Sequence, residues 1–120
     1  MVAIHAENLG DLAVVECKGR IVQSDSVFKL RDVVQAQSDA RVIAVDLSEV
    51  KAIGGGGLGM LAFLARWAEQ HDIRLKLFAP SASVLEGLAQ TRSIMKFEIA
   101  SFREMMNLVA QSEESYPMAA

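Results

Sequence analysis

Four consecutive glycines, Gly54 to Gly57, are the residues of this sequence whose type and spacing most clearly suggest chemistry. Leu58 and Gly59 follow them, ahead of a helix-like run that ends near Gln70. The first amide groups of a helix have no partner inside the helix and attract anions. Glycine in a helix or strand costs about 0.5–1 kcal/mol relative to alanine, so a run of four needs a reason. We expect this junction to carry the function.

The glycines match the dinucleotide-binding pattern G-x-G-x-x-G at Gly54, Gly56 and Gly59. That pattern requires a tight turn directly after a strand and a carboxylate near the end of the next strand. We predict six intervening residues, Ser48 to Ile53, and the carboxylate position reads Phe78-Ala79-Pro80. Both features disfavour a dinucleotide. A site for another anion or nucleotide at the bare helix start remains an alternative, as does a purely structural tight turn.

The other reactive residue types are isolated along the chain. We find no carboxylate or cysteine at metal-ligand spacing from His5 or His71, so we predict no metal site. Cys17 lies in a strand-like apolar run and is expected to be a buried thiol. Asp46 ends a strand without a nucleophile and base beside it. The sequence therefore predicts no catalytic residue, no cofactor and no enzymatic activity.

Strand-like and helix-like segments alternate around the glycine run. Strands are expected at residues 2–4, 12–17 with an extension to 22, 42–47, 73–78 and 96–99, and helices at residues 24–37, 57–70, 81–90 and 101–111. A strand, helix and second strand at this spacing predict a parallel pair with a right-handed crossover. The fold class is α/β, with a mixed sheet of about five strands and about four helices in one domain, residues 1–111. Residues 112–120 are expected to be a flexible tail.

Composition narrows the range of partners. A length of 120 residues with 52% hydrophobic content suits one globular domain. The net charge of −3, with basic residues scattered singly, disfavours nucleic acid. No apolar run approaches the roughly 20 residues that cross a bilayer, and no signal segment opens the sequence, so we expect a cytoplasmic location without direct membrane insertion.

Several motifs together resemble the STAS domain, the fold of anti-sigma factor antagonists. They cover about residues 10 to 110 and comprise Gly19-Arg20-Ile21, the run from Val42 to Ile53, the glycines with Leu58-Gly59-Met60-Leu61, Leu75 to Phe78, and Ser83 to Ala89. The resemblance implies a non-enzymatic protein-interaction module of a bacterial partner-switching or scaffold complex that regulates transcription. Its partner would be an anti-sigma factor that is also a serine kinase. The alternative within the family is a STAS subunit of a lipid-transport ABC complex, with the transporter ATPase as partner.

The sequence departs from this family at the phosphorylated residue. The family segment reads aspartate, serine, serine or threonine, glycine, leucine, glycine, and its second hydroxyl is the phospho-acceptor. Here that position is Gly56, so no phosphate can be attached. We expect constitutive binding, or regulation by the partner or at another hydroxyl, with Ser24, Ser26 and Ser48 as candidates. A turn residue bonded to local backbone is the structural alternative for Ser48.

A second apolar stripe runs along the helix that follows the glycines. On a helical wheel, Leu58, Leu61, Ala62, Ala65 and Ala68 form the stripe expected to pack on the sheet, and nearly opposite them lie Met60, Phe63, Leu64 and Trp67. Either the helix at residues 81–90 covers this second stripe, or the stripe is exposed for a partner. In the second case Gly54, Gly55, Gly56 and Gly57 would join it in one partner-binding face.

Overall fold

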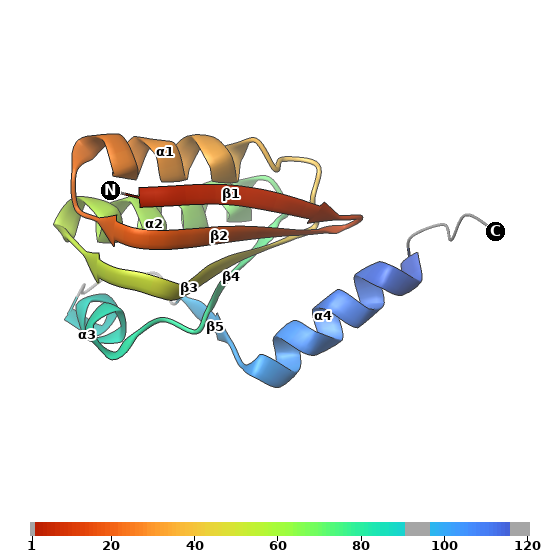
Figure 1. Ribbon diagram of the computed structural model, residues 1–120. Coiled ribbons are helices and arrows are strands. Elements are labelled where there is room, and N and C mark those ends of the chain that lie inside the picture. The colour runs from red at the N-terminus through yellow and green to blue at the C-terminus, as the bar shows by residue number, and fades with distance from the viewer. Residues whose placement is uncertain (1, 91–96, 116–120) are drawn as a thin grey trace.

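The structure is a computed structural model, and it describes residues 2–90 and 97–115, with side chains through Ser112. Five strands form one sheet in the order β1-β2-β3-β4-β5 (Figure 1). The strands are β1 (Val2–Leu9), β2 (Leu12–Ile21), β3 (Val42–Ile53), β4 (Arg74–Phe78) and β5 (Glu98–Ala100). The helices are α1 (Ser24–Gln35), α2 (Gly55–Gln70), α3 (Ala82–Gln90) and α4 (Phe102–Ser115). This mixed five-stranded sheet with four helices confirms the predicted fold class.

The first two strands form an antiparallel hairpin, and every later strand is parallel to its neighbour. Gly10 stands in the two-residue turn of the hairpin with a φ of 73°, a conformation that side chains rarely adopt. The parallel strands have their carboxyl ends at one edge of the sheet. Helices α1 and α2 both begin at that edge, because each follows the end of a strand.

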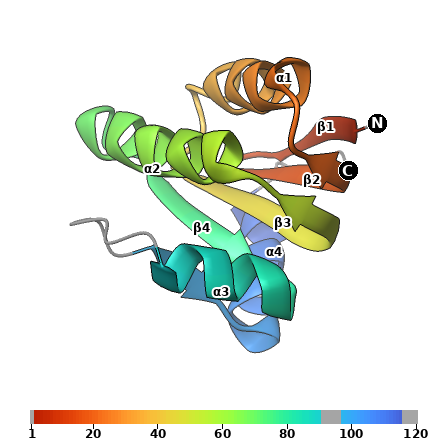
Figure 2. The same ribbon diagram turned by 90° about the vertical axis from the view of Figure 1, so that its left-hand side faces the viewer.

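Helices cover the two faces of the sheet unequally. Buried residues of α1, α2 and α3 belong to the main core and Met105 of α4 belongs to a smaller cluster, and Figure 2 shows α1 and α2 next to each other over the sheet. Alternation along β3 explains the two layers, since Ile43 and Val45 belong to the main core while Ala44 belongs to a smaller cluster with Met105 of α4. Lys76 adds polar contacts to the second layer through ion pairs of 3.2 Å to Glu98 and 3.4 Å to Glu104. The glycine-rich start of α2 therefore belongs to the layer of helices that covers the main core.

Three element boundaries differ from the prediction by more than two residues. β3 continues to Ile53, beyond the predicted end at residue 47, because it stays paired with β2 across two register shifts. β1 reaches Leu9, since the hairpin pairs it along its whole length. α4 extends to Ser115 and contains part of the predicted tail, whereas residues 116–120 lie outside the described residues. No helix in the described ranges combines the length and apolarity required to span a bilayer.

A partner-docking surface at the start of helix α2

A single residue separates the end of β3 from the first residue of α2. Gly54 is that residue and serves as the N-cap, with a φ of −91° and a ψ of 178°. Its N–H donates to the carbonyl of Ile21 at 2.9 Å, and its own carbonyl accepts from the N–H of Leu58 at 3.0 Å. The predicted six-residue gap is thus wrong, because β3 runs up to the glycines. The lack of a carboxylate at Phe78-Ala79-Pro80 still disfavours a dinucleotide.

The glycines differ in how much room surrounds them. A Cβ built at Gly55 or Gly59 meets no heavy atom within 4 Å, and one at Gly56 meets only the Val27 side chain at 3.8 Å. At Gly57 a Cβ would lie 2.6 Å from Cγ1 of Ile53 and 3.0 Å from a backbone oxygen. None of these glycines is among the described residues with positive φ. Packing therefore requires glycine at Gly57 and leaves the exposed positions free to carry a side chain.

The helix start is bare in chemical terms as well. Gly54, the N-cap residue, has no side chain that could cap α2. The first turn of α2 contains no acidic residue. Gly55 and Gly56 are exposed, whereas Gly57 is buried. The first N–H groups of a helix point outward and carry partial positive charge. The exposed part of the run therefore offers backbone amides without surrounding side chains.

The second stripe of α2 is only partly available to a partner. Leu64 is fully buried in the main core, so its predicted place in the docking face is wrong, as is that of buried Gly57. The buried face contains Gly57, Leu61, Leu64 and Ala68, which recur at helical spacing. Met60 and Trp67 are half-buried and pack against the main core. Phe63 stays 51% exposed and is the stripe residue best placed to contact another molecule.

Helix α1, rather than α3, borders the glycines along α2. Val27 of α1 is the side chain nearest to a Cβ at Gly56, whereas Gly87 of α3 lies against Leu58. These contacts do not support the alternative in which residues 81–90 cover the second stripe. Val22 lies 3.7 Å from a Cβ built at Gly54 and is 49% exposed. The sequence prediction missed Val22, because only the pairing of β2 with β3 brings it beside the glycines.

The three candidate hydroxyls have different environments. Ser26 is buried, and its hydroxyl donates to the carbonyl of Gln23 at 2.6 Å, so a kinase cannot reach it in this fold. Ser24 is exposed at the first position of α1. Ser48 is also exposed, but it lies within β3 rather than in a turn, and its N–H donates to the Asp46 carboxylate at 2.9 Å. Ser24 and Ser48 are the candidates that remain accessible.

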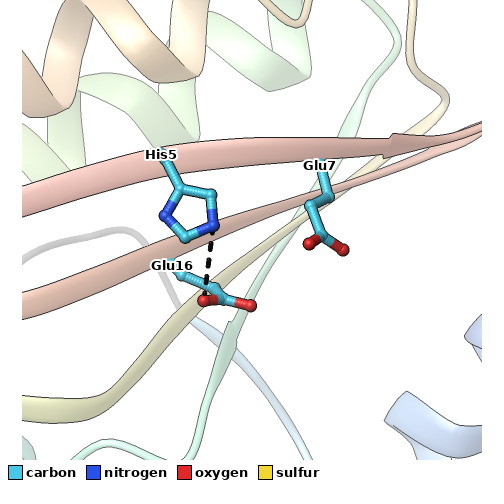
Figure 3. Close-up of side chains that lie close together, drawn as sticks. All are labelled: His5, Glu7 and Glu16. Carbon is cyan, nitrogen blue, oxygen red and sulfur yellow. Dashed lines mark ion pairs between the residues drawn. The ribbon is translucent and has the colours of Figure 1, made fainter.

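Among the residues that the structure describes, Cys17, His71 and His5 occupy separate places. Burial, reinforced by the charge of Asp46, raises the pKa of the Cys17 thiol to about 12, so the thiol stays protonated at neutral pH. His71 follows α2, and its Nδ1 lies 2.8 Å from the Trp67 carbonyl, which can only accept a hydrogen bond. His5 lies elsewhere, with Glu7 and Glu16 (Figure 3). The expectation that it has no carboxylate at ligand spacing is wrong.

Comparison with known proteins decides the family. The sequence matches the STAS domain family over residues 3–114. The chain belongs to the STAS domain family. Among curated proteins no significant match is found.

Solved structures of several proteins share the fold at low sequence identity. An anti-sigma factor antagonist from Mycobacterium paratuberculosis has a TM-score of 0.75 and 17% identity, over 92% of this chain and 95% of that chain. The Bacillus cell fate determinant SpoIIAA in its phosphorylated form has a TM-score of 0.68 and 17% identity, over 89% and 99%. The murine Solute Carrier 26 family member A9 anion transporter has a TM-score of 0.67 and 15% identity, over 88% of this chain but 18% of that chain.

Proposed function

We propose that this STAS domain is a non-enzymatic interaction module that acts as an anti-sigma factor antagonist in a bacterial partner-switching complex. Its partner would be an anti-sigma factor of the serine kinase type, bound in the cytoplasm. The observation that carries this proposal is the set of exposed glycines at the start of α2, which have room for side chains but carry none. The family segment that the chain resembles would place an aspartate and two hydroxyls at these positions.

The docking surface consists of exposed Gly55 and Gly56, half-buried Gly54 and their apolar neighbours. We define it as Val22, Gly54, Gly55, Gly56, Met60 and Phe63. Phe63 follows Gly56 by seven residues, so it lies on the same side of α2 about 10 Å further along. An exposed aromatic residue beside accessible backbone suits a protein surface, because aromatic side chains provide much of the binding energy at interfaces.

Regulation of this surface would differ from a serine switch. Gly56 has no atom to carry a phosphate, so the charge that phosphorylation adds cannot appear at the helix start. We infer that the domain binds its partner constitutively, or that control comes from the partner or from accessible Ser24 or Ser48. Ser26 is left out because its hydroxyl is buried and bonded.

A subunit of a membrane-transport complex is the second candidate function. The likeness to part of the murine anion transporter favours it, because the STAS fold there belongs to a much longer transport protein. For the present chain the corresponding partner would be the ATPase of a lipid-transport ABC complex. Both candidates are protein-binding functions, and the identity of the bound partner separates them.

Affinity capture from the native cells tests the proposal. The bait is the full chain, compared with Gly56→Asp, which adds charge and bulk at an exposed position where a Cβ makes ordinary contacts. The matched control is Ala110→Asp, which adds the same charge at an exposed position of α4, away from the docking surface. We expect wild type and control to retain a kinase-type anti-sigma factor and Gly56→Asp to lose it. A transporter ATPase would instead support the second candidate, and equal capture by all three proteins would remove the glycines from the interface.

A further inference from the structure

Three potential metal ligands lie together on the hairpin, away from the α2 surface. His5 and Glu7 belong to β1, and Glu16 belongs to β2 (Figure 3). One ligand atom from each side chain lies within 4.8 Å of the other two, and Nε2 of His5 is 3.6 Å from a carboxylate oxygen of Glu16. His5 and Glu7 are exposed and Glu16 is half-buried, so ions in solution can reach all three.

The register of the hairpin holds these residues on one face. His5 stands directly opposite Glu16, and Glu7 follows His5 by two residues, the spacing that places side chains on the same side of a strand. Their neighbours Ile4, Val15 and Cys17 point the other way, into the main core. A slip by one residue would expose those apolar side chains, so core packing fixes the placement of the ligands. Sites built on paired strands are better positioned than sites on loops.

The donor set matches a transition metal better than a hard cation. Zn²⁺ accepts histidine nitrogen and carboxylate oxygen at about 2.0–2.2 Å, and neighbouring ligands in such a tetrahedron lie roughly 3.3 Å apart. The 3.6 Å separation of His5 and Glu16 is close to that value. A rotamer change of exposed Glu7 can close the remaining separation. Ca²⁺ prefers six to eight oxygen ligands, and Mg²⁺ is bound by oxygen with retained water, so a nitrogen donor gives neither an advantage.

We propose that His5, Glu7 and Glu16 form a surface site for a divalent transition-metal ion of the Zn²⁺ class. The three side chains supply one nitrogen and two oxygen ligands, and water completes the coordination. A bound cation also offsets the repulsion between the two carboxylates, whose ligand oxygens lie within 4.8 Å of each other. This site is separate from the proposed docking surface on α2, which lies on the opposite side of the sheet.

Calorimetric titration of the untagged, EDTA-treated full chain with ZnCl₂ tests the site. We expect one Zn²⁺ per chain, and at least about a tenfold loss of affinity in His5→Ala and in Glu16→Gln, since each removes a ligand. His71→Ala is the matched control, because it removes the other histidine of the chain and should leave Zn²⁺ affinity unchanged. Melting temperatures in EDTA show whether each variant is folded. CaCl₂ in place of ZnCl₂ should give no comparable heat.

Four outcomes would overturn the proposal: no stoichiometric Zn²⁺ binding by the wild-type chain, equal binding by a folded His5→Ala variant, loss of binding in His71→Ala, or Ca²⁺ binding as tight as that of Zn²⁺. A second measurement uses Co²⁺ as the probe. Its visible absorption should show the intense bands of low-coordinate Co²⁺ with the wild-type chain and lose them in His5→Ala.

Discussion

Alanine at Gly59 should stabilise the domain, whereas alanine at Gly57, two residues earlier in the same helix, should destabilise it. A Cβ at Gly59 meets no heavy atom within 4 Å. The substitution therefore changes helix propensity alone, which favours alanine by about 0.8–1 kcal/mol. For a chain of this size that gain corresponds to a rise in melting temperature of roughly 3–5 °C.

At Gly57 the same propensity gain is opposed by a steric clash. The new Cβ would lie 2.6 Å from Cγ1 of Ile53 and 3.0 Å from the carbonyl oxygen of Ile21. That oxygen accepts the Gly54 N–H at 2.9 Å, so it cannot move without disturbing the junction. Overpacking of this kind costs about 1–3 kcal/mol. With the propensity gain subtracted, we expect a net loss of up to roughly 2 kcal/mol, and a difference of about 1–3 kcal/mol between the two variants, which is the overpacking cost itself.

Urea denaturation, followed by far-UV circular dichroism and by the fluorescence of the single tryptophan, Trp67, measures both free energies of unfolding. Equal slopes of the transitions would show that the denatured states are comparable. Equal stabilisation by both substitutions would falsify the claim that packing requires glycine at Gly57. Destabilisation by Gly59→Ala would show that the space around that position is filled in solution.

Three further predictions concern the docking surface, the missing phospho-acceptor and the buried thiol. Phe63→Ala should weaken partner binding while leaving the melting temperature nearly unchanged, whereas Leu64→Ala should cost about 2–5 kcal/mol of stability, and equal stability losses would refute this assignment. Gly56→Ser should become a substrate for the partner kinase, as mapped by phosphopeptide mass spectrometry, and a folded variant that stays unmodified would contradict the proposed mode of docking. The Cys17 thiol should resist thiol reagents at pH 8 unless the protein is unfolded. Burial raises the pKa of Cys17 to about 12 in the folded state from an ordinary 9.0, so its contribution to stability is present below about pH 9 and is lost as the pH rises from 9 to 12. Cys17→Ala should lack this part of the pH dependence. Identical curves of unfolding free energy against pH for the variant and the wild-type chain would contradict the prediction.

Local patterns in the sequence were enough to predict the fold. Short β-branched runs separated by amphipathic segments give the order of strands and helices, and their spacing gives the parallel crossovers. The extent of β3 was not predictable in this way. Ser48, Glu49 and Lys51 resemble a loop in composition, yet they remain in the strand because β2 pairs with it across two register shifts.

Helical periodicity predicts which residues of α2 share a stripe, but not which of those residues are buried and which are exposed. Leu64 shares the second stripe with exposed Phe63 and is nevertheless buried, because a wheel shows which residues share a face and not how the helix is rotated against the sheet. The same limit applies to α4, where Phe102 and Met106 are 71% and 51% exposed while Met105 between them is buried. Contacts between distant segments determine these rotations.

The cluster of His5, Glu7 and Glu16 was missed for a related reason. With the first strand predicted to end at Ile4, no pairing linked His5 to the second strand. Two residues of spacing between His5 and Glu7 would have indicated a shared face once the strand was extended to Leu9. Hairpin register is thus the information that converts scattered residues into a candidate site.

The single-residue link between β3 and α2 has a thermodynamic consequence for recognition. Hydrogen bonds to the Ile21 carbonyl and from the Leu58 N–H fix Gly54, so no flexible loop between β3 and α2 has to become ordered when a partner binds. Ordering a mobile loop would subtract from the affinity, whereas a prearranged contact area loses little entropy on association. A run of glycines is usually a source of flexibility, but here it is fixed in the strand-to-helix junction. A small contact area therefore loses less of its binding free energy to ordering.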